Sequence, residues 1–360
     1  MYLEKQIITY IGNKRSLLDF IGYAYDHASK TLNKNHLTCL DGFSGSGIVS
    51  RYFKEKGASK VIANDMEYFC KLISECYLTN KSEINIKEIE ELTSFLESTK
   101  LKGDPDFNYP TGIIELFYAP QYDDDIQDYE RVFYTNSNAR IIDNTRARTD
   151  NKYILAPLLS EASIKTNTGG VFKGFYKDSN TKIGKFGGTK GQALSRILAP
   201  ITITPPILSD KECEYEVFCQ DTSNLDIEEV DLAYYDPPYN QHPYGSNYHM
   251  LNTIATYEEP EEISEVAGIP KNWNRSNYNY KAKALNAMDT LLASSNAKII
   301  AISYNNEGFI SEQQFEDILV KYGEFEVLNK QYNTYRASRN LGSRNLYTTE
   351  YIYILKKYLN

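Results

Sequence analysis

Four consecutive residues, Asp236-Pro237-Pro238-Tyr239, combine groups that could hold a planar amine. They follow residues 230–235, an apolar run whose length and composition are typical of a buried strand. Two prolines end such a strand because neither can donate a ladder hydrogen bond. A carboxylate, free carbonyls and an aromatic ring then converge at a strand end, where open α/β sheets bind ligands. This favours the exocyclic amine of a nucleobase as the ligand, with a plain turn as the alternative.

A glycine loop forms a second candidate site. It spans residues 42–47, between a predicted short strand at 38–41 and a predicted helix at 48–53, and its glycines let a ligand approach the helix N-terminus closely. The next predicted strand, 60–64, ends at Asp65 about 20 residues after the loop, the spacing at which an acid accepts ribose hydroxyls. Loop and acid together predict an adenosine-containing ligand. The alternative is an ordinary βαβ unit with a capping Asp.

Two further stretches could reach the same crevice. Residues 10–15, Tyr-Ile-Gly-Asn-Lys-Arg, precede apolar residues at helical spacing, so a helix start beside Lys14 could hold a carboxylate, unless the stretch is only a basic surface turn. Asp221 follows a predicted strand at 215–219 and is a candidate for the adenine amino group of the ligand. It could instead cap the turn formed by residues 221–224.

The composition is that of a globular protein of one large domain or two modest ones. The 360 residues are 41% apolar, no apolar run reaches membrane-spanning length, and no signal peptide is expected. Five cysteines without CxxC spacing predict reduced, mostly buried thiols in a cytoplasmic protein. With four histidines and no His/Cys cluster, we expect no metal site.

Charge is distributed unevenly along the chain. The net charge of −9 does not indicate nucleic-acid binding, and residues 83–130 hold thirteen acids against three lysines. Residues 140–200, in contrast, hold eleven Lys and Arg against four acids, interleaved with aromatic residues and glycines. Such a stretch can follow a phosphate backbone and reach bases, although it could also be a surface loop. Residues 330–344, with four basic residues and no acid, are a second candidate element facing DNA.

Read together, these stretches resemble the Dam-like (alpha-group) DNA adenine-N6 methyltransferases of type II restriction–modification systems, most closely the Fok-type members. The order of the motifs carries the resemblance: Tyr-Ile-Gly-Asn-Lys at 10–14, the FxGxG loop at 43–47, a long insert, then Asp-Pro-Pro-Tyr. The likeness continues through Asn247-Tyr248-His249 and Tyr335-Arg336, and residues 170–175 look like Fok-type recognition segments.

The resemblance implies an α/β fold, a Rossmann-like class I S-adenosylmethionine-dependent methyltransferase sheet. Residues 1–80 and 212–360 would form the catalytic domain and residues 81–211 an inserted DNA target-recognition domain. The cofactor would be S-adenosyl-L-methionine and the partner double-stranded DNA, with no membrane contact. A cognate restriction endonuclease would be encoded separately, and the protein would be cytoplasmic and associated with the nucleoid. The oligomeric state is not predicted.

The resemblance also assigns roles. The target adenine would be flipped out of the duplex, its N6 amine donating to the Asp236 carboxylate and the Pro237 carbonyl and its ring stacking on Tyr239. The catalytic residues would be Asp236, Pro237, Pro238 and Tyr239. The cofactor-binding residues would be Tyr10, Gly12, Asn13, Lys14, Asp41, Phe43, Ser44, Gly45, Ser46, Gly47, Asp65 and Asp221. The DNA-binding residues would be Lys173, Lys177, Lys182, Lys185, Lys190, Arg336 and Arg339.

Three alternatives stay open. N4-cytosine methylation would use the same geometry, although Ser is commoner than Asp at the first motif position there. An RNA base N-methyltransferase is disfavoured by the basic insert and the N-terminal motif. A non-catalytic nucleic-acid-binding module is disfavoured by the intact loop, ribose acid and catalytic motif. No suitably placed cysteine is present, which argues against cytosine-C5 methylation.

Overall fold

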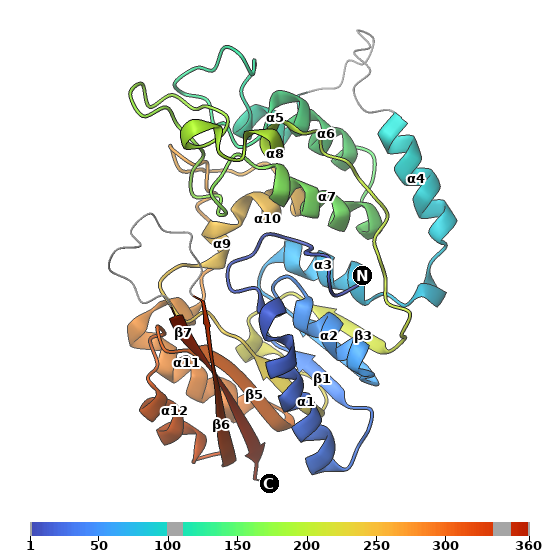
Figure 1. The fold of residues 1–360 in the computed structure, drawn as a ribbon, viewed down its shortest axis with the longest axis vertical. Coiled ribbons are helices and arrows are strands. Elements are labelled where there is room, and N and C mark those ends of the chain that lie inside the picture. Colours follow the sequence, from blue (N-terminus) through green and yellow to red (C-terminus); the bar gives the residue numbers. More distant parts are fainter. Residues whose placement is uncertain (1, 99–110, 334–346, 359–360) are drawn as a thin grey trace.

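One seven-stranded sheet organises the chain, with strand order β3-β2-β1-β4-β5-β7-β6 (Figure 1). The computed structural model describes residues 2–98, 111–333 and 347–358. Its strands are β1 (Thr38–Asp41), β2 (Lys60–Asn64), β3 (Glu214–Phe218), β4 (Val230–Tyr235), β5 (Ala297–Asn305), β6 (Gly323–Asn333) and β7 (Tyr347–Lys357). The first five run parallel, whereas β7 lies antiparallel between β5 and β6. The α/β fold predicted from the sequence is confirmed, and the sheet is mixed because β7 runs antiparallel to its neighbours.

The strand order reverses next to β1, which places two loops side by side. β1 pairs with β2 on one side and with β4 on the other, and Asp41 lies opposite Tyr234. The glycine loop leaves β1 and residues 236–239 leave β4, so both loops start from adjacent strand ends. This is the switch point at which open α/β sheets bind ligands.

Helices cover both faces of the sheet. On one face, α1 (Leu18–Leu32) and α2 (Ile48–Lys56) share an apolar cluster with side chains such as Leu232 of β4. On the other face, α11 (Lys281–Ser294) and α12 (Glu312–Leu319) pack on strand side chains that point to that face, such as Ala233 of β4. Because alternate β4 residues enter different cores, the continuous apolar run of β4 is explained by burial on both sides.

The segment between the second and third strands builds a helical layer beyond the carboxyl ends of the strands (Figure 1). It holds α4 (Ile86–Ser98), α5 (Ile113–Tyr118), α6 (Asn136–Arg146), α7 (Lys152–Lys165) and α8 (Leu194–Leu198). Its apolar side chains form one cluster with α3 (Tyr68–Leu78) and α10 (His249–Thr256), which follows the short α9 (Tyr244–Asn247). The layer therefore shares its core with helices that flank the sheet.

Short 3-10 turns complete the described structure. They span Lys14–Leu17, Lys81–Glu83, Thr189–Gly191, Thr222–Asn224 and Asn277–Asn279. Four cysteines are buried as predicted and Cys219 is exposed, all five unpaired. Within residues 2–98, 111–333 and 347–358, no helix has the length and apolarity needed to cross a membrane, and no cluster of three or more His, Cys, Asp or Glu side chains could hold a metal ion.

The shared core generates a stability prediction. Leu158 on α7 is fully buried, so we expect Leu158→Ala to cost about 2–5 kcal/mol of unfolding free energy. Urea unfolding followed by far-UV circular dichroism and by the fluorescence of Trp273, the only tryptophan, should show both signals shifting together. Leu116→Ala, which is 61% exposed on α5, is the matched control and should change little. A Trp273 transition that stays in place while the dichroism signal splits would show that the helical layer unfolds independently.

Candidate active site

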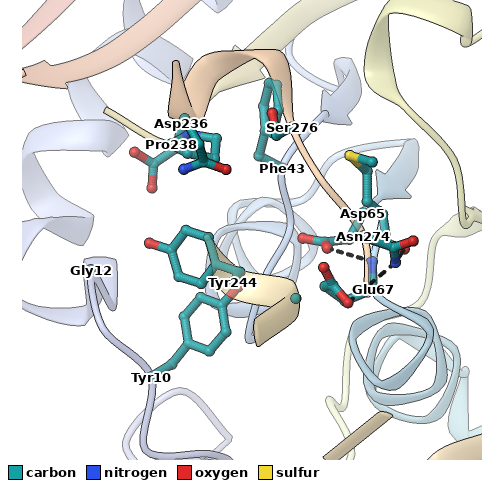
Figure 2. A pocket seen from close by; sticks show the side chains of 13 residues that line it. Tyr10, Gly12, Phe43, Asp65, Glu67, Asp236, Pro238, Tyr244, Asn274 and Ser276 are labelled. Carbon is teal, nitrogen blue, oxygen red and sulfur yellow. Dashed lines mark hydrogen bonds between the residues drawn. The ribbon is translucent and has the colours of Figure 1, made fainter. Parts of the chain in front are cut away.

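A cavity of about 570 Å³ of empty space, its open mouth included, lies at the carboxyl ends of β1, β2 and β4 (Figure 2). Its lining residues are Tyr10, Gly12, Phe43, Asp65, Met66, Glu67, Asp236, Pro238, Tyr244, Gly245, Asn274, Ser276 and Asn279. Figure 2 shows Asp65 and Glu67 across the cavity from Tyr10 and Tyr244. The cavity is thus lined by the N-terminal motif (residues 10–14), the glycine loop (residues 42–47) and the strand-end acid Asp65. It is also lined by the turn formed by residues 236–239, called the catalytic corner.

The glycine loop fits closely under Tyr10. Gly45 and Gly47 have φ values of 49° and 70°, which favour glycine, and a Cβ on Gly45 would lie 2.9 Å from the Tyr10 ring. The Gly45 N–H donates to Asp65 Oδ2 at 2.8 Å, and the Glu67 N–H donates to Asp65 Oδ1 at 2.9 Å. These bonds join the end of β1 to the end of β2 and fix the Asp65 side chain.

Two buried polar atoms at the loop lack a partner among the described residues: Asp41 Oδ1 and Ser44 Oγ. The other Asp41 oxygen accepts from the Ser50 N–H at 2.9 Å and from its hydroxyl at 2.6 Å. Burial raises the pKa of Asp41 to about 7. Burying unsatisfied polar atoms is costly. A ligand that brings an ammonium group and hydrogen-bond acceptors would satisfy both atoms.

Glu67 is a cavity residue that sequence reasoning missed. Its side chain is buried, and two amides hold the carboxylate, Asn252 on α10 and Asn274 in the loop before α11. Burial, with the nearby Asp65 charge, raises the pKa of Glu67 to about 7. The only local signal was its position two residues after a strand-end acid.

The Asp236 carboxylate is paired and mostly buried. Lys14 Nζ lies 3.1 Å from Asp236 Oδ1, with the Lys14 side chain 7% exposed and that of Asp236 19% exposed. Burial raises the pKa of Asp236 to about 6; Lys14 opposes this rise and Glu350 adds to it. The N-terminal motif, predicted to hold cofactor, is therefore also in contact with the predicted catalytic acid.

The ring of Tyr239 is also fixed. It packs edge-on against Tyr304, with centroids 6.3 Å apart and planes at 78°, and its carbonyl accepts from the Phe309 N–H at 3.0 Å. Tyr239 lines a second pocket of about 770 Å³ of empty space, whose other lining residues are Ile11, Val171, Lys173, Pro238, Asn240, His242, Tyr244 and Asn247. Pro238 and Tyr244 line both pockets, so the corner separates two adjoining spaces.

Two tyrosines, Tyr244 on α9 and Tyr248 between α9 and α10, hold the N-terminal motif in place. The Ile11 N–H donates to the Tyr248 hydroxyl at 2.7 Å, and the Tyr244 hydroxyl donates to the Ile11 carbonyl at 3.2 Å. The Tyr10 ring stacks on both, at centroid distances of 4.9 and 4.8 Å. Neither tyrosine was predicted as a site residue, although their spacing of four places them on one helical face.

His249 joins the insert to the catalytic corner. Its Nε2–H donates to the Phe172 carbonyl at 2.9 Å, and the Phe172 N–H donates to the Asn247 carbonyl at 2.8 Å. Burial lowers the pKa of His249 to about 4, so its ring is neutral at pH 7, with Nδ1 unpartnered within the described structure. The role of His249, open from the sequence, is to anchor the 170–175 segment.

The remaining predicted site residues lie elsewhere. The Asn13 side chain accepts from the Arg15 N–H at 2.9 Å and caps the first 3-10 turn. Asp221 accepts from the Ser223 N–H at 2.9 Å, caps the Thr222–Asn224 turn and does not line the 570 Å³ cavity.

The predicted DNA-binding residues lie mostly on the insert surface. Lys173 lines the second pocket, Lys177, Lys182 and Lys190 are exposed, and Lys185 is half-buried, 3.8 Å from Asp178. Arg336 and Arg339 lie outside the described residues.

Comparison with known proteins identifies the family. The family model described as D12 class N6 adenine-specific DNA methyltransferase matches residues 10–318. The chain belongs to this family. This match decides for adenine N6 in DNA over cytosine N4 and RNA bases, and it makes the protein an S-adenosylmethionine-dependent enzyme that acts on DNA.

Curated relatives agree over most of the chain. The type II methyltransferase M.NlaIII of Neisseria lactamica is 28% identical over 97% of this chain and 99% of its own. M.CviAII of Paramecium bursaria Chlorella virus 1 is 30% identical, with 92% and 93% covered. M.FokI of Planomicrobium okeanokoites is 28% identical over 97% of this chain, which spans only 52% of M.FokI.

S-adenosylmethionine fits the residues of this D12 enzyme. The cofactor carries an ammonium group, a carboxylate, ribose hydroxyls and an adenine. The Asp65 and Glu67 carboxylates line the cavity and match the hydroxyls. Asp41 Oδ1 and Ser44 Oγ do not line it, but they are buried without a partner among the described residues at the glycine loop and match the polar groups of the methionine moiety. When bound, the cofactor supplies an electrophilic methyl group on sulfur.

The neutral His249 ring predicts an acid-sensitive anchor. Its folded pKa of about 4 lies below the unfolded value, so the unfolded state takes up the proton first, and the wild type loses stability as pH falls from about 6.5 to 4. His249→Gln keeps an N–H donor without that titration. Denaturation at pH 7 and pH 5 should show the wild type losing roughly 2 kcal/mol more than the variant. Equal losses in the two proteins would refute the buried neutral ring.

Proposed function

We propose that this D12 enzyme is the modification methyltransferase of a type II restriction–modification system. It would methylate adenine N6 within one specific duplex DNA sequence and protect that sequence from an endonuclease encoded separately. The names of M.NlaIII, M.CviAII and M.FokI as type II methyltransferases support this role. The observation that carries the proposal is the position of the Asp-Pro-Pro-Tyr corner between two pockets, one at the glycine loop and the other reaching the insert.

The second pocket is proposed to receive the flipped adenine. Tyr239 offers its fixed ring for stacking, and Asp236 with the Pro237 carbonyl offers acceptors for the two N6 protons. Pro238, in the wall common to both pockets, keeps the corner rigid. These groups orient the amine lone pair toward the first pocket. Catalysis then rests on positioning and electrostatics, and no covalent intermediate with the protein is needed.

The first pocket is proposed to hold S-adenosylmethionine. The methionine moiety would lie on the N-terminal motif and the glycine loop, and the ribose on Asp65. The proposed binding residues are those predicted from the sequence: Tyr10, Gly12, Asn13, Lys14, Asp41, Phe43, Ser44, Gly45, Ser46, Gly47, Asp65 and Asp221. The structure supports the loop and Asp65 most directly, because they line or border the cavity, whereas the Asp221 side chain is engaged in a cap.

Residues 81–211 are proposed to read the DNA sequence, with residues 1–80 and 212–360 carrying out catalysis. Exposed lysines of the insert, among them Lys177, Lys182 and Lys190, would contact phosphates. Lys173, at the rim of the second pocket, would contact the flipped nucleotide. We also propose a Dam-like, Fok-type mode of recognition, supported by the anchoring of the 170–175 segment beside the catalytic corner.

The direct test identifies the methylated base. Purified protein is incubated with duplex DNA and radiolabelled S-adenosylmethionine, and the DNA is digested to nucleosides. Label should appear in N6-methyladenine, and Asp236→Asn should reduce it by about 100-fold or more, because the amide replaces a charged acceptor of the amine by a neutral one and adds a competing NH2 donor. Asp226→Asn, an exposed aspartate before β4, is the control and should be active. Incorporation that approaches one methyl group per adenine on unrelated duplexes would refute site specificity.

The pKa of Asp236 predicts an acid limb in the rate. Only the ionised carboxylate can accept from the N6 amine, and its pKa of about 6 in the free enzyme is raised above the usual value by burial. With S-adenosylmethionine saturating, so that groups needed only for cofactor binding do not contribute, we therefore expect kcat/KM for DNA to be constant above pH 7 and to fall about tenfold per pH unit below pH 6. Circular dichroism over the same range checks that the protein stays folded. A flat profile from pH 7 down to pH 5 would contradict the proposed role of the carboxylate.

A further inference from the structure

Glu350, near the start of β7, forms the far end of a buried chain of charges. Its Oε1 accepts from Lys14 Nζ at 2.7 Å and from the Ser303 hydroxyl at 2.5 Å. Lys14 Nζ in turn lies 3.1 Å from Asp236 Oδ1. One ammonium group thus lies between two carboxylates, and the Glu350 side chain is only 1% exposed.

The position of Glu350 in the sheet requires such a partner. Side chains two and four residues further along β7, Ile352 and Ile354, enter the apolar cluster under α1 and α2. A carboxylate on the same face as these residues carries a desolvation cost of several kcal/mol unless it is paired and hydrogen-bonded. Lys14 and Ser303 supply that pairing, so packing of the sheet alone does not account for an acid at this position.

The charge balance shows what Glu350 contributes. With Lys14 alone beside it, the charge of Asp236 would be cancelled by the ammonium group. The ammonium would also repel a cation bound in the first pocket, which Asp236 lines. With Glu350 present, these three groups together carry one negative charge, in addition to the Asp65 and Glu67 carboxylates that line the pocket elsewhere. Interactions in such a poorly hydrated site are screened less than at the surface.

We propose that Glu350 is a positioning residue that neutralises Lys14, so that Lys14 can hold Asp236 in place while the Asp236 end of the pocket keeps a net negative charge for the sulfonium group of the cofactor. Methyl transfer converts the sulfonium into a neutral thioether. Glu350 therefore makes the enzyme prefer S-adenosylmethionine over its product S-adenosylhomocysteine, which favours product release.

The test is a comparison of cationic and neutral ligands on the full chain without DNA. Isothermal titration at pH 8 measures binding of S-adenosylmethionine, of sinefungin (an analogue with an ammonium group near the sulfonium position) and of S-adenosylhomocysteine. In Glu350→Gln, binding of both cations should weaken relative to the neutral ligand on the order of tenfold, the size of a unit-charge interaction over about 10 Å at an effective dielectric constant of about 20. An unchanged ratio in the folded variant overturns the proposal.

A matched control and a second variant separate charge from structure. Asp231→Asn removes another buried, lysine-paired carboxylate from the opposite end of β4 and should leave the ratio unchanged. Combining Glu350→Gln with Lys14→Met leaves Asp236 as the only charge of the three. Because Lys14 also favours the ionised form of Asp236, the double variant is titrated from pH 8 to about pH 9, and its ratio should return to the wild-type value as Asp236 ionises. A ratio that stays as low as that of Glu350→Gln over this range also overturns the proposal. The double variant lacks the buried carboxylate and its ammonium partner together, so it supplies this test even if Glu350→Gln fails to fold.

Because no DNA is present, the outcome does not depend on the proposed restriction–modification role. A protein that methylates no DNA but prefers cations through Glu350 would refute that role and leave the inference standing.

Discussion

The active site depends on the ion pair between Lys14 and Asp236. A carboxylate at the end of a buried strand is costly to ionise, and its pKa of about 6 is the result of burial opposed by one ammonium group. Tyr244 and Tyr248 bind both backbone groups of Ile11 and so hold the segment that carries Lys14. Helices α9 and α10 follow Asp236 in the chain, so the segment after the catalytic corner also places the cation that keeps its acid ionised.

The same helices connect chemistry to the insert. The core of the helical layer includes α10 side chains, and the 170–175 segment is bonded to Asn247 and His249 on either side of Tyr248. A displacement of that segment would therefore reach the N-terminal motif through one tyrosine. These contacts form a continuous physical connection between the insert and the N-terminal motif.

The sequence predicted what local patterns encode. The apolar run before Asp236, the glycine loop and the strand ending before Asp65 each carry their signal within a few residues, and the structure brings all three to one cavity. Residues that act through distant partners carried no such signal. Glu350 is 336 positions from Lys14, and Phe172 is 77 positions from His249. Asp221 shows that a local pattern can also fit two roles. An acid after a strand can bind a ligand or cap the following turn, and the structure shows Asp221 capping the turn.

Sheet topology explains why Glu350, which had no local signal in the sequence, lies at the active site. In a fully parallel sheet, the start of a strand lies at the edge away from the ligand. β7 is antiparallel, so its first residues lie beside the last residues of β5, and Glu350 is paired with Asn305. That register brings Glu350 to the Ser303 hydroxyl and to the edge where β4 ends at Asp236. The antiparallel strand thus adds a further acid to the ligand edge, beside Asp65 and Asp236, which follow the parallel strands β2 and β4.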